Sequence, residues 1–400
     1  MNICKKIFCR TVQLGFRAAM PVLPYRDPKI YEKVSDAADI LCELKIDRVM
    51  IVTDRFLRTS GATGELERSL EEKGIACCVY DETRPNPTAD NVEKARKLYL
   101  QEYCRGLIAF GGGSSMDCAK AVGARVVYPR KTLAKLSGNL KVWRKLPPLI
   151  AIPTTAGTGS ETTVTAVITD ERTKHKCTMN NFPFIPPYAI LDPAVTVSLP
   201  PHLTATTGMD ALTHAVEAYI GHSTTKETRR LALDATSLIF SSIETAYSCP
   251  EDLTARKNML LASHKAGLAF SKSYVGYVHA VAHSLGGQYN IPHGLANSVL
   301  LPIVLEDYGE CIHEKLKDLA VAAGISDKTE DKSVAANKFI AAVRAKNKAM
   351  GIRETLDGIE PSDIPQMANY ADKEGNPLYP VPKFYDAKEL ERFYHLVRSE

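Results

Sequence analysis

The chain has 400 residues, of which 45% are hydrophobic, so it is long enough for two or three domains and a substantial core. Its formal net charge of +4 is small for this length and argues against nucleic acid as a main partner. The ten cysteines form no CxxC pair and no regular framework, which favours reduced thiols in a cytoplasmic protein, and no apolar run reaches the ~18 residues that a membrane span needs.

The first twenty residues contain no acidic side chain and four basic ones, Lys5, Lys6, Arg10 and Arg17. The charges between positions 5 and 10 interrupt any apolar core of a secretory signal. We expect an amphipathic segment that packs on the folded domain, and the alternative is an anchor on a membrane surface.

From position 45 onward, short apolar runs alternate with helical patterns. The predicted strands are 49–53, 76–80, 106–110, 149–153 and 188–191, and the predicted helices between the earlier ones are 56–73, 89–103 and 115–127. Short and almost wholly apolar strands separated by helices predict a parallel α/β sheet covered on both faces. Ligands of such sheets bind at the carboxyl ends of the strands.

Asp54 is the first polar candidate at such an end, because it follows the apolar run VMIVT. A carboxylate there can accept both ribose hydroxyls of adenosine and repel a 2′-phosphate. It can equally serve as the N-cap of the next helix.

A glycine-rich segment, GGGSSMDCAK, follows the third predicted strand at positions 111–120. Its glycines allow the backbone to approach a pyrophosphate, and the helix expected from Ser115 offers free amide groups and a positive dipole end. The segment is not a GxGxxG fingerprint, since Met116 stands where a glycine is required. A simple strand-to-helix turn is the alternative.

A hydroxyl-rich segment, IPTTAGTGSETT, follows the next strand at positions 152–163. Hydroxyl groups and exposed amides suit a carboxamide or a phosphate, whereas the plain alternative is a polar surface loop. Two such loops at the ends of neighbouring strands favour one extended ligand, and a dinucleotide has that length.

After Pro200 the strand patterns give way to helical ones, which predicts a soft boundary near Leu199 and domains 1–199 and 200–400. The predicted helices are 204–220, 226–247, 253–269, 274–285, 295–306, 311–323, 332–350 and 387–397. We expect the active site in a cleft between the two domains.

Histidines concentrate in this half of the chain, although the whole sequence has only ten. Asp210 and His214 are four residues apart, as are His279 and His283, so each pair shares a helical face; His293 follows a turn in which Gly286, Gly287 and Pro292 are expected to end the helix. A single pair of this kind is usually an accident of a core or surface, but two pairs and a further histidine predict a divalent-metal site.

Four segments, 111–120, 154–161, 208–219 and 276–302, resemble the signature blocks of the iron-containing alcohol dehydrogenases, and the resemblance covers about residues 46–394. It implies a Rossmann-like dinucleotide-binding domain followed by an all-α domain. It further implies that Asp210, His214, His279 and His293 bind the metal and that His283 lies near the nicotinamide as a proton relay. The cofactor contacts implied by the resemblance are Asp54, Asn86, Gly111, Gly112, Gly113, Ser114, Asp117, Thr154, Thr155, Thr158, Thr163 and Lys176.

These residues predict an oxidoreductase that transfers a hydride between NAD(H) and a small primary alcohol, aldehyde or diol. Four nitrogen and oxygen ligands suit Fe(II), and Zn(II) would bind them more tightly at equal supply. The alternatives are a zinc-dependent polyol dehydrogenase of the same architecture, a metallohydrolase, and a non-catalytic protein with a structural metal. We expect a cytoplasmic homo-oligomer, a dimer or larger, with no nucleic-acid or membrane partner.

Overall fold

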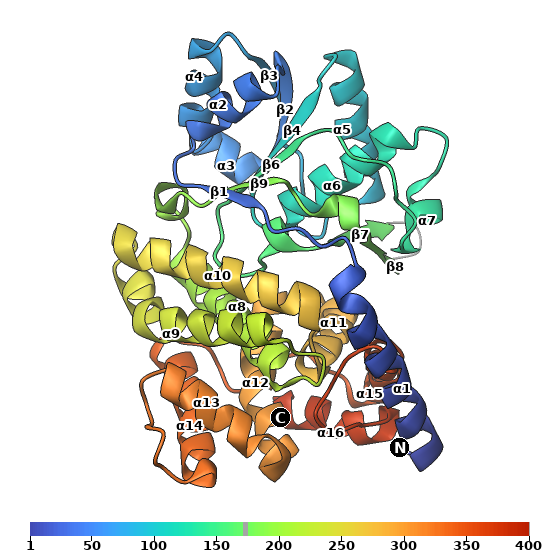
Figure 1. Ribbon diagram of the computed structural model, residues 1–400, viewed down its shortest axis with the longest axis vertical. Coiled ribbons are helices and arrows are strands. Elements are labelled where there is room, and N and C mark those ends of the chain that lie inside the picture. The colour runs from blue at the N-terminus through green and yellow to red at the C-terminus, as the bar shows by residue number, and fades with distance from the viewer. Residues whose placement is uncertain (171–174, 400) are drawn as a thin grey trace. The chain divides into compact units, whose positions relative to one another are not determined.

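The computed structural model describes residues 1–170 and 175–399 (Figure 1). The chain forms two compact units: Pro24–Ser198 contains the sheets, and Leu199–Glu400 together with Met1–Leu23 is helical. The change of unit at Leu199 lies where the sequence places it, whereas residues 1–23 pack with the helical unit rather than with the sheet. Among the described residues, no helix has the length and apolar character that crossing a membrane requires.

The larger sheet has six parallel strands in the order β1-β9-β6-β4-β2-β3. Their bounds are β1 Lys29–Tyr31, β2 Arg48–Val52, β3 Ala76–Tyr80, β4 Gly106–Gly111, β6 Leu149–Pro153 and β9 Tyr188–Ile190. The five predicted strands are therefore present, and β1 is an addition at the edge. Parallel pairing places the carboxyl ends of β2, β3, β4 and β6 along one edge of the sheet.

Both faces of this sheet are covered, as its apolar strands require. Helices α2 (Asp36–Glu43) and α4 (Gly64–Glu72) bury one set of alternate side chains, which includes Ile51 and Ile108. Helices α5 (Ala89–Gln101) and α6 (Gly113–Val127) bury the other set, which includes Met50 and Leu107. Successive side chains along each strand thus belong alternately to two separate hydrophobic cores.

The predicted helix 56–73 is wrong as a single element. It is divided into α3 (Arg55–Thr59) and α4, because Gly61 adopts a positive φ of 79° that ends the first helix. The unit also contains the short helix α7 (Leu133–Leu136) and a small second sheet that the sequence did not predict. That sheet has the order β5-β8-β7, with bounds Gly138–Asn139, His175–Asn180 and Thr165–Asp170 respectively.

The helical unit is built around α8 (Pro201–Ile220), which is buried along most of its length and packs against α9, α10 and α12. The other bounds are α9 Lys226–Ser248, α10 Leu253–Ser273, α11 Tyr277–Tyr289, α12 His293–Tyr308, α13 His313–Ala322, α14 Lys332–Ala349, α15 Ile364–Gly375 and α16 Ala387–Val397. All eight predicted helices are present, with ends shifted by up to four residues. Helix α15 is an additional element.

The prediction that Gly286 and Gly287 end helix α11 is wrong. Both glycines lie inside the helix, which continues to Tyr289 and ends where Asn290 adopts the left-handed conformation, with φ of 57°. Asparagine is one of the few residues that tolerate this conformation at a helix end. Pro292 then precedes α12, so His293 is the first residue of that helix.

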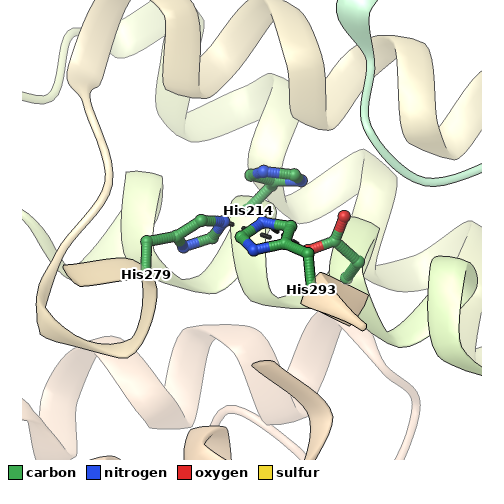
Figure 2. Close-up of side chains that lie close together, drawn as sticks. His214, His279 and His293 are labelled. Carbon is green, nitrogen blue, oxygen red and sulfur yellow. Dashed lines mark ion pairs between the residues drawn. The ribbon is translucent and has the colours of Figure 1, made fainter. Parts of the chain in front are cut away.

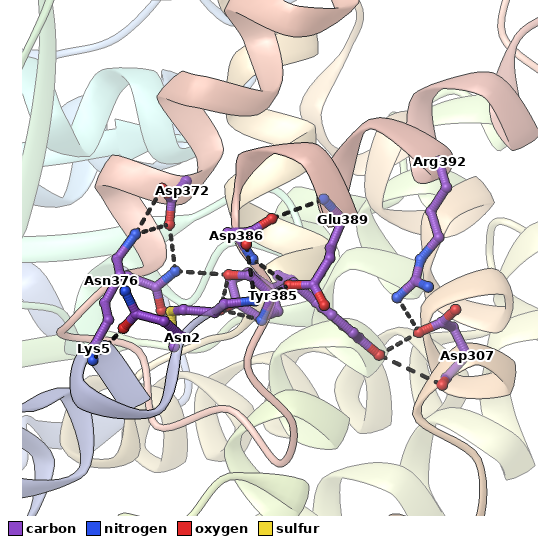
Figure 3. A network of polar contacts seen from close by, with 11 residues as sticks. Asn2, Lys5, Asp307, Asp372, Asn376, Tyr385, Asp386, Glu389 and Arg392 are labelled. Carbon is purple, nitrogen blue, oxygen red and sulfur yellow. Dashed lines mark hydrogen bonds and ion pairs between the residues drawn. The ribbon is translucent and has the colours of Figure 1, made fainter. Parts of the chain in front are cut away.

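The basic N-terminal segment forms helix α1 (Ile3–Ala19), which is held by the C-terminal helices of the same unit (Figure 3). Lys5 Nζ lies 2.9 Å from Asp372 Oδ2, and Gln13 Nε2 donates to the carbonyl oxygen of Tyr379 at 2.7 Å. Cys9 and Gln13 are buried beneath the helix, while Ile3 and Ile7 on its outer side are exposed. The segment packs on the folded unit, as predicted.

Candidate metal centre and cofactor loops

Four candidate metal ligands converge in the helical unit. Asp210 and His214 lie one turn apart on α8, His279 lies on α11 and His293 begins α12; one ligand atom from each lies within 4.8 Å of the other three. Asp210 Oδ1 is 3.6 Å from His293 Nε2 and 3.9 Å from His279 Nε2. Figure 2 shows the three imidazoles gathered around one point. Ligands about 2.1 Å from a common cation lie about 3.4 Å apart in a tetrahedral site, so this geometry fits a divalent metal.

Glycine allows α12 to approach α8 closely enough for this arrangement. A Cβ atom on Gly294 would lie 2.5 Å from the carbonyl oxygen of Thr206, so α12 could not begin beside α8 with any larger residue there. Gly294 therefore allows His293 to lie beside Asp210. Gly208 on α8 similarly allows close packing against α9, since a Cβ atom there would lie 2.7 Å from Cδ1 of Ile243.

The charge state of the site suits a cation. Burial lowers the pKa of His279 well below its ordinary value, and neighbouring His214 and His293 lower it further. A neutral imidazole keeps a lone pair for a metal. His279 thus offers a neutral nitrogen donor beside the Asp210 carboxylate.

Asn297 is a further residue of this site that the sequence reasoning did not select. Its amide nitrogen lies 2.6 Å from Asp210 Oδ1, 3.2 Å from His279 Nε2 and 3.1 Å from His293 Nε2. An NH2 group that lies this close to all three atoms shows that the candidate ligand atoms converge. Asn297 is four residues after His293 on α12, and this spacing was the signal available in the sequence.

His283 lies one turn beyond His279, and its ring stacks on that of His293 with centroids 4.9 Å apart. Its Nδ1 lies 2.6 Å from Glu374 Oε1, which also accepts a hydrogen bond from the Tyr379 hydroxyl at 2.7 Å. Burial alone would raise the pKa of Glu374, but His283 and Tyr379 lower it below its ordinary value. His283 is therefore oriented by a carboxylate that the sequence reasoning did not identify.

The predicted cofactor residues of the sheet unit gather at the carboxyl edge of the larger sheet. Asp54 follows β2 and caps α3, accepting a hydrogen bond from Leu57 N at 2.9 Å. Asn86 is exposed in the loop after β3. The remaining predicted residues lie in the β4–α6 turn, on α6 and in the segment from β6 to β7; they are Gly111, Gly112, Gly113, Ser114, Asp117, Thr154, Thr155, Thr158 and Thr163. Lys176 is on β8, and its side chain lies outside the described residues.

The glycine-rich turn packs tightly against the hydroxyl-rich loop, and a larger residue in the turn would require the threonine side chains of the loop to shift. A Cβ atom on Gly112 would lie 3.3 Å from the Thr155 side chain, and one on Gly113 would lie 3.1 Å from that of Thr158. Helix α6 begins at Gly113, two residues earlier than predicted, so its free amide groups belong to the glycine segment itself. The turn therefore presents the N-terminus of a fifteen-residue helix to an anion.

Lys120, the last residue of the glycine-rich block, ties this turn to the hydroxyl-rich loop. Its buried ammonium lies within 3.2 Å of five oxygen atoms, two each from Ser160 and Thr163 and one from Thr165. Asp117 accepts hydrogen bonds from the Ser160 hydroxyl and from Val167 N, both at 3.0 Å. Asp117 and Thr163 consequently hold the loop in place.

Comparison with known proteins decides the family. The profile of the iron-containing alcohol dehydrogenases matches residues 30–193, and the profile of the C-terminal part of the Fe-containing alcohol dehydrogenase family matches residues 204–395. The chain belongs to the iron-containing alcohol dehydrogenase family. Its activity is that of a metal-dependent oxidoreductase acting with NAD(H) on alcohols or aldehydes, as the sequence predicts.

Individual relatives agree with this assignment. The 1,3-propanediol dehydrogenase of Klebsiella pneumoniae is 37% identical over 365 residues, which are 90% of this chain and 93% of the relative. A crystal structure of 1,3-propanediol oxidoreductase superposes with a TM-score of 0.88 at 35% identity, covering 93% of this chain and 97% of the other. Sulfoacetaldehyde reductase from Bifidobacterium kashiwanohense, solved in complex with NAD+, gives a TM-score of 0.83 at 28% identity, covering 93% and 98%.

The family assignment confirms the predicted fold class of a parallel α/β unit followed by a helical one. It supports neither the metallohydrolase nor the non-catalytic alternative. The roles of individual residues in this alcohol dehydrogenase, and the cleft between its two units, stay predictions.

Proposed function

We propose that this iron-type alcohol dehydrogenase interconverts small primary alcohols or diols and their aldehydes with NAD(H). The observation that carries the proposal is the convergence of Asp210, His214, His279 and His293 in a chain of this family. The 1,3-propanediol specificity named for the Klebsiella relative supports a short diol as a substrate.

In this proposal the four ligands hold a divalent cation, for which Fe(II) is the family's metal. Such a cation supplies Lewis acidity, which stabilises the negative charge that develops on the substrate oxygen by several kcal/mol. The glycine-rich turn binds the pyrophosphate at the N-terminus of α6, and the hydroxyl-rich loop orients the nicotinamide end. His283, whose Nδ1 is held by Glu374, accepts the alcohol proton at Nε2 and releases it toward solvent.

The experiment is an aldehyde panel with anaerobically purified protein. We expect NADH absorbance to fall with propanal or 3-hydroxypropanal, and metal analysis to find about one divalent ion per chain. Protein that binds NADH and one metal but reduces no aldehyde or ketone would contradict the proposed substrate class. Protein that binds neither would contradict the proposed chemistry.

We also propose that the enzyme is cytoplasmic and homo-oligomeric. The ten cysteines are all free, which supports a reducing compartment. Analytical ultracentrifugation of the native protein measures the oligomeric state directly.

Asp54 gives a prediction about cofactor choice. Asp54→Asn should keep the N-cap of α3, since asparagine accepts the same hydrogen bond from Leu57 N, while removing the charge that repels a 2′-phosphate. We expect the NADP-to-NAD ratio of kcat/KM to rise about tenfold or more, which corresponds to about 1.4 kcal/mol. Steady-state kinetics with both cofactors measures this ratio, and Asp54→Gly should raise it similarly. An unchanged ratio in both variants would show that Asp54 only caps the helix.

A further inference from the structure

Glu217 is a buried carboxylate beside the metal centre that is not among the predicted ligands. It lies on α8 three residues after His214 and seven after Asp210, so the three side chains share one face of the helix. The residue is 2% exposed. A carboxylate buried this deeply requires specific donors.

Those donors all come from the start of α11. Glu217 Oε2 accepts hydrogen bonds from Gly276 N at 2.8 Å, and its Oε1 accepts one from Val278 N at 2.8 Å. His279 Nδ1 lies 2.6 Å from Oε2. A Cβ atom on Gly276 would lie 2.7 Å from Oε1, so only glycine leaves room for the carboxylate.

This arrangement favours one tautomer of His279. Burial raises the pKa of Glu217, whereas the hydrogen bonds from Gly276 N and Val278 N lower it and favour the carboxylate form. A carboxylate can only accept, so it favours the tautomer in which His279 Nδ1 carries the proton. The other ring nitrogen, Nε2, then carries its lone pair on the side of Asp210 and the Asn297 side chain. Hydrogen bonding of this kind also raises the basicity of an imidazole toward a metal.

We propose that Glu217 is a positioning residue that holds His279 in the Nδ1–H tautomer and aims its Nε2 at the divalent cation. The inference rests on the proposed function, because it takes His279 as a ligand. Glu217 contributes through His279 rather than by touching the cation, since its oxygens are occupied by the three N–H groups.

The Glu217→Gln variant tests whether His279 needs a carboxylate acceptor at this position. A glutamine has the same size, but its NH2 group must replace one carboxylate oxygen. Facing His279, the NH2 group would donate to Nδ1 and favour the Nε2–H tautomer, which turns a proton toward the cation. Facing Val278 N, it would oppose another donor and displace the side chain. Either orientation disfavours metal binding.

We expect Glu217→Gln to bind Zn2+ and Co2+ about 10- to 100-fold more weakly than the wild type, measured on apo protein by competition with a chromophoric chelator. The visible spectrum of bound Co2+ should also change, which a purely structural defect elsewhere would not cause. Tyr219→Phe is the matched control: it removes the Tyr219–Asp318 hydrogen bond of 2.5 Å from the same helix without touching His279, and should keep wild-type affinity.

Wild-type affinity and an unchanged Co2+ spectrum in Glu217→Gln would overturn the inference. If that variant fails to fold, 15N chemical shifts of the imidazoles in the wild-type apo protein decide the question, because they distinguish the two tautomers. An Nε2–H tautomer at His279 would overturn the proposed role, and an Nδ1–H tautomer would support it. Failure of the wild type itself to bind a divalent cation would instead contradict the proposed function.

Discussion

A His279→Ala variant is expected to lose its metal and at least about 10³-fold of its turnover. The substitution removes one of four ligands from a buried site, and the loss of Lewis-acid stabilisation worth about 4 kcal/mol corresponds to that factor. NADH binding should be retained, because the predicted cofactor residues all lie within Pro24–Ser198, whereas His279 belongs to the helical unit. Metal analysis, aldehyde reduction and NADH fluorescence measure the three quantities.

His202→Ala provides the control for this variant. His202 is an exposed histidine near the start of α8, the helix that carries Asp210 and His214, and its removal should change none of the three measurements. Wild-type metal content and turnover in His279→Ala would remove this residue from the ligand set.

A Lys120→Met variant is expected to destabilise the sheet unit and weaken cofactor binding together. Methionine preserves most of the volume but leaves five oxygen atoms without their common donor, and removing one partner from a buried charged network costs about 3–5 kcal/mol. Because the loop from Thr154 to Thr165 would lose its anchor, we expect the KM for NADH to rise about tenfold or more while metal content stays at the wild-type level.

Urea unfolding, NADH titration and hydrogen exchange of the 152–165 peptide measure these effects. Lys145→Met is the matched control, since Lys145 is exposed in the same unit. An unchanged exchange rate and NADH affinity in Lys120→Met would show that the loop is held by its own backbone and not by the ammonium group.

The elements that could be predicted from the sequence are those whose own residue pattern determines which of their faces are buried. Strands such as 106–110 are wholly apolar, and only a sheet covered on both faces buries such a run. Residue type and helical spacing predicted a metal site from two pairs and a further histidine, and the family resemblance selected Asp210, His214, His279 and His293. These four residues converge in the structure.

The features that the sequence did not predict depend on contacts between distant segments. In the sequence Glu217 resembles any polar residue in an apolar helix, and only the folded chain shows that α11 places two backbone N–H groups and the His279 ring around it. Lys120 resembles a surface lysine until the loop after β6 folds over its ammonium group. Likewise, the sequence predicts that Gly286 and Gly287 end their helix, whereas both lie within α11, where Gly286 is buried.

If Asp210, His214, His279 and His293 hold iron as proposed, their placement on α8, α11 and α12 links iron supply to the lifetime of the folded enzyme. These residues converge only in the folded chain, so a cation that binds them stabilises the folded state and not the unfolded one. An iron-starved cell would accordingly hold a protein whose helical half opens more often and is more readily digested by proteases. Metal scarcity would thus lower the amount of the enzyme as well as its activity.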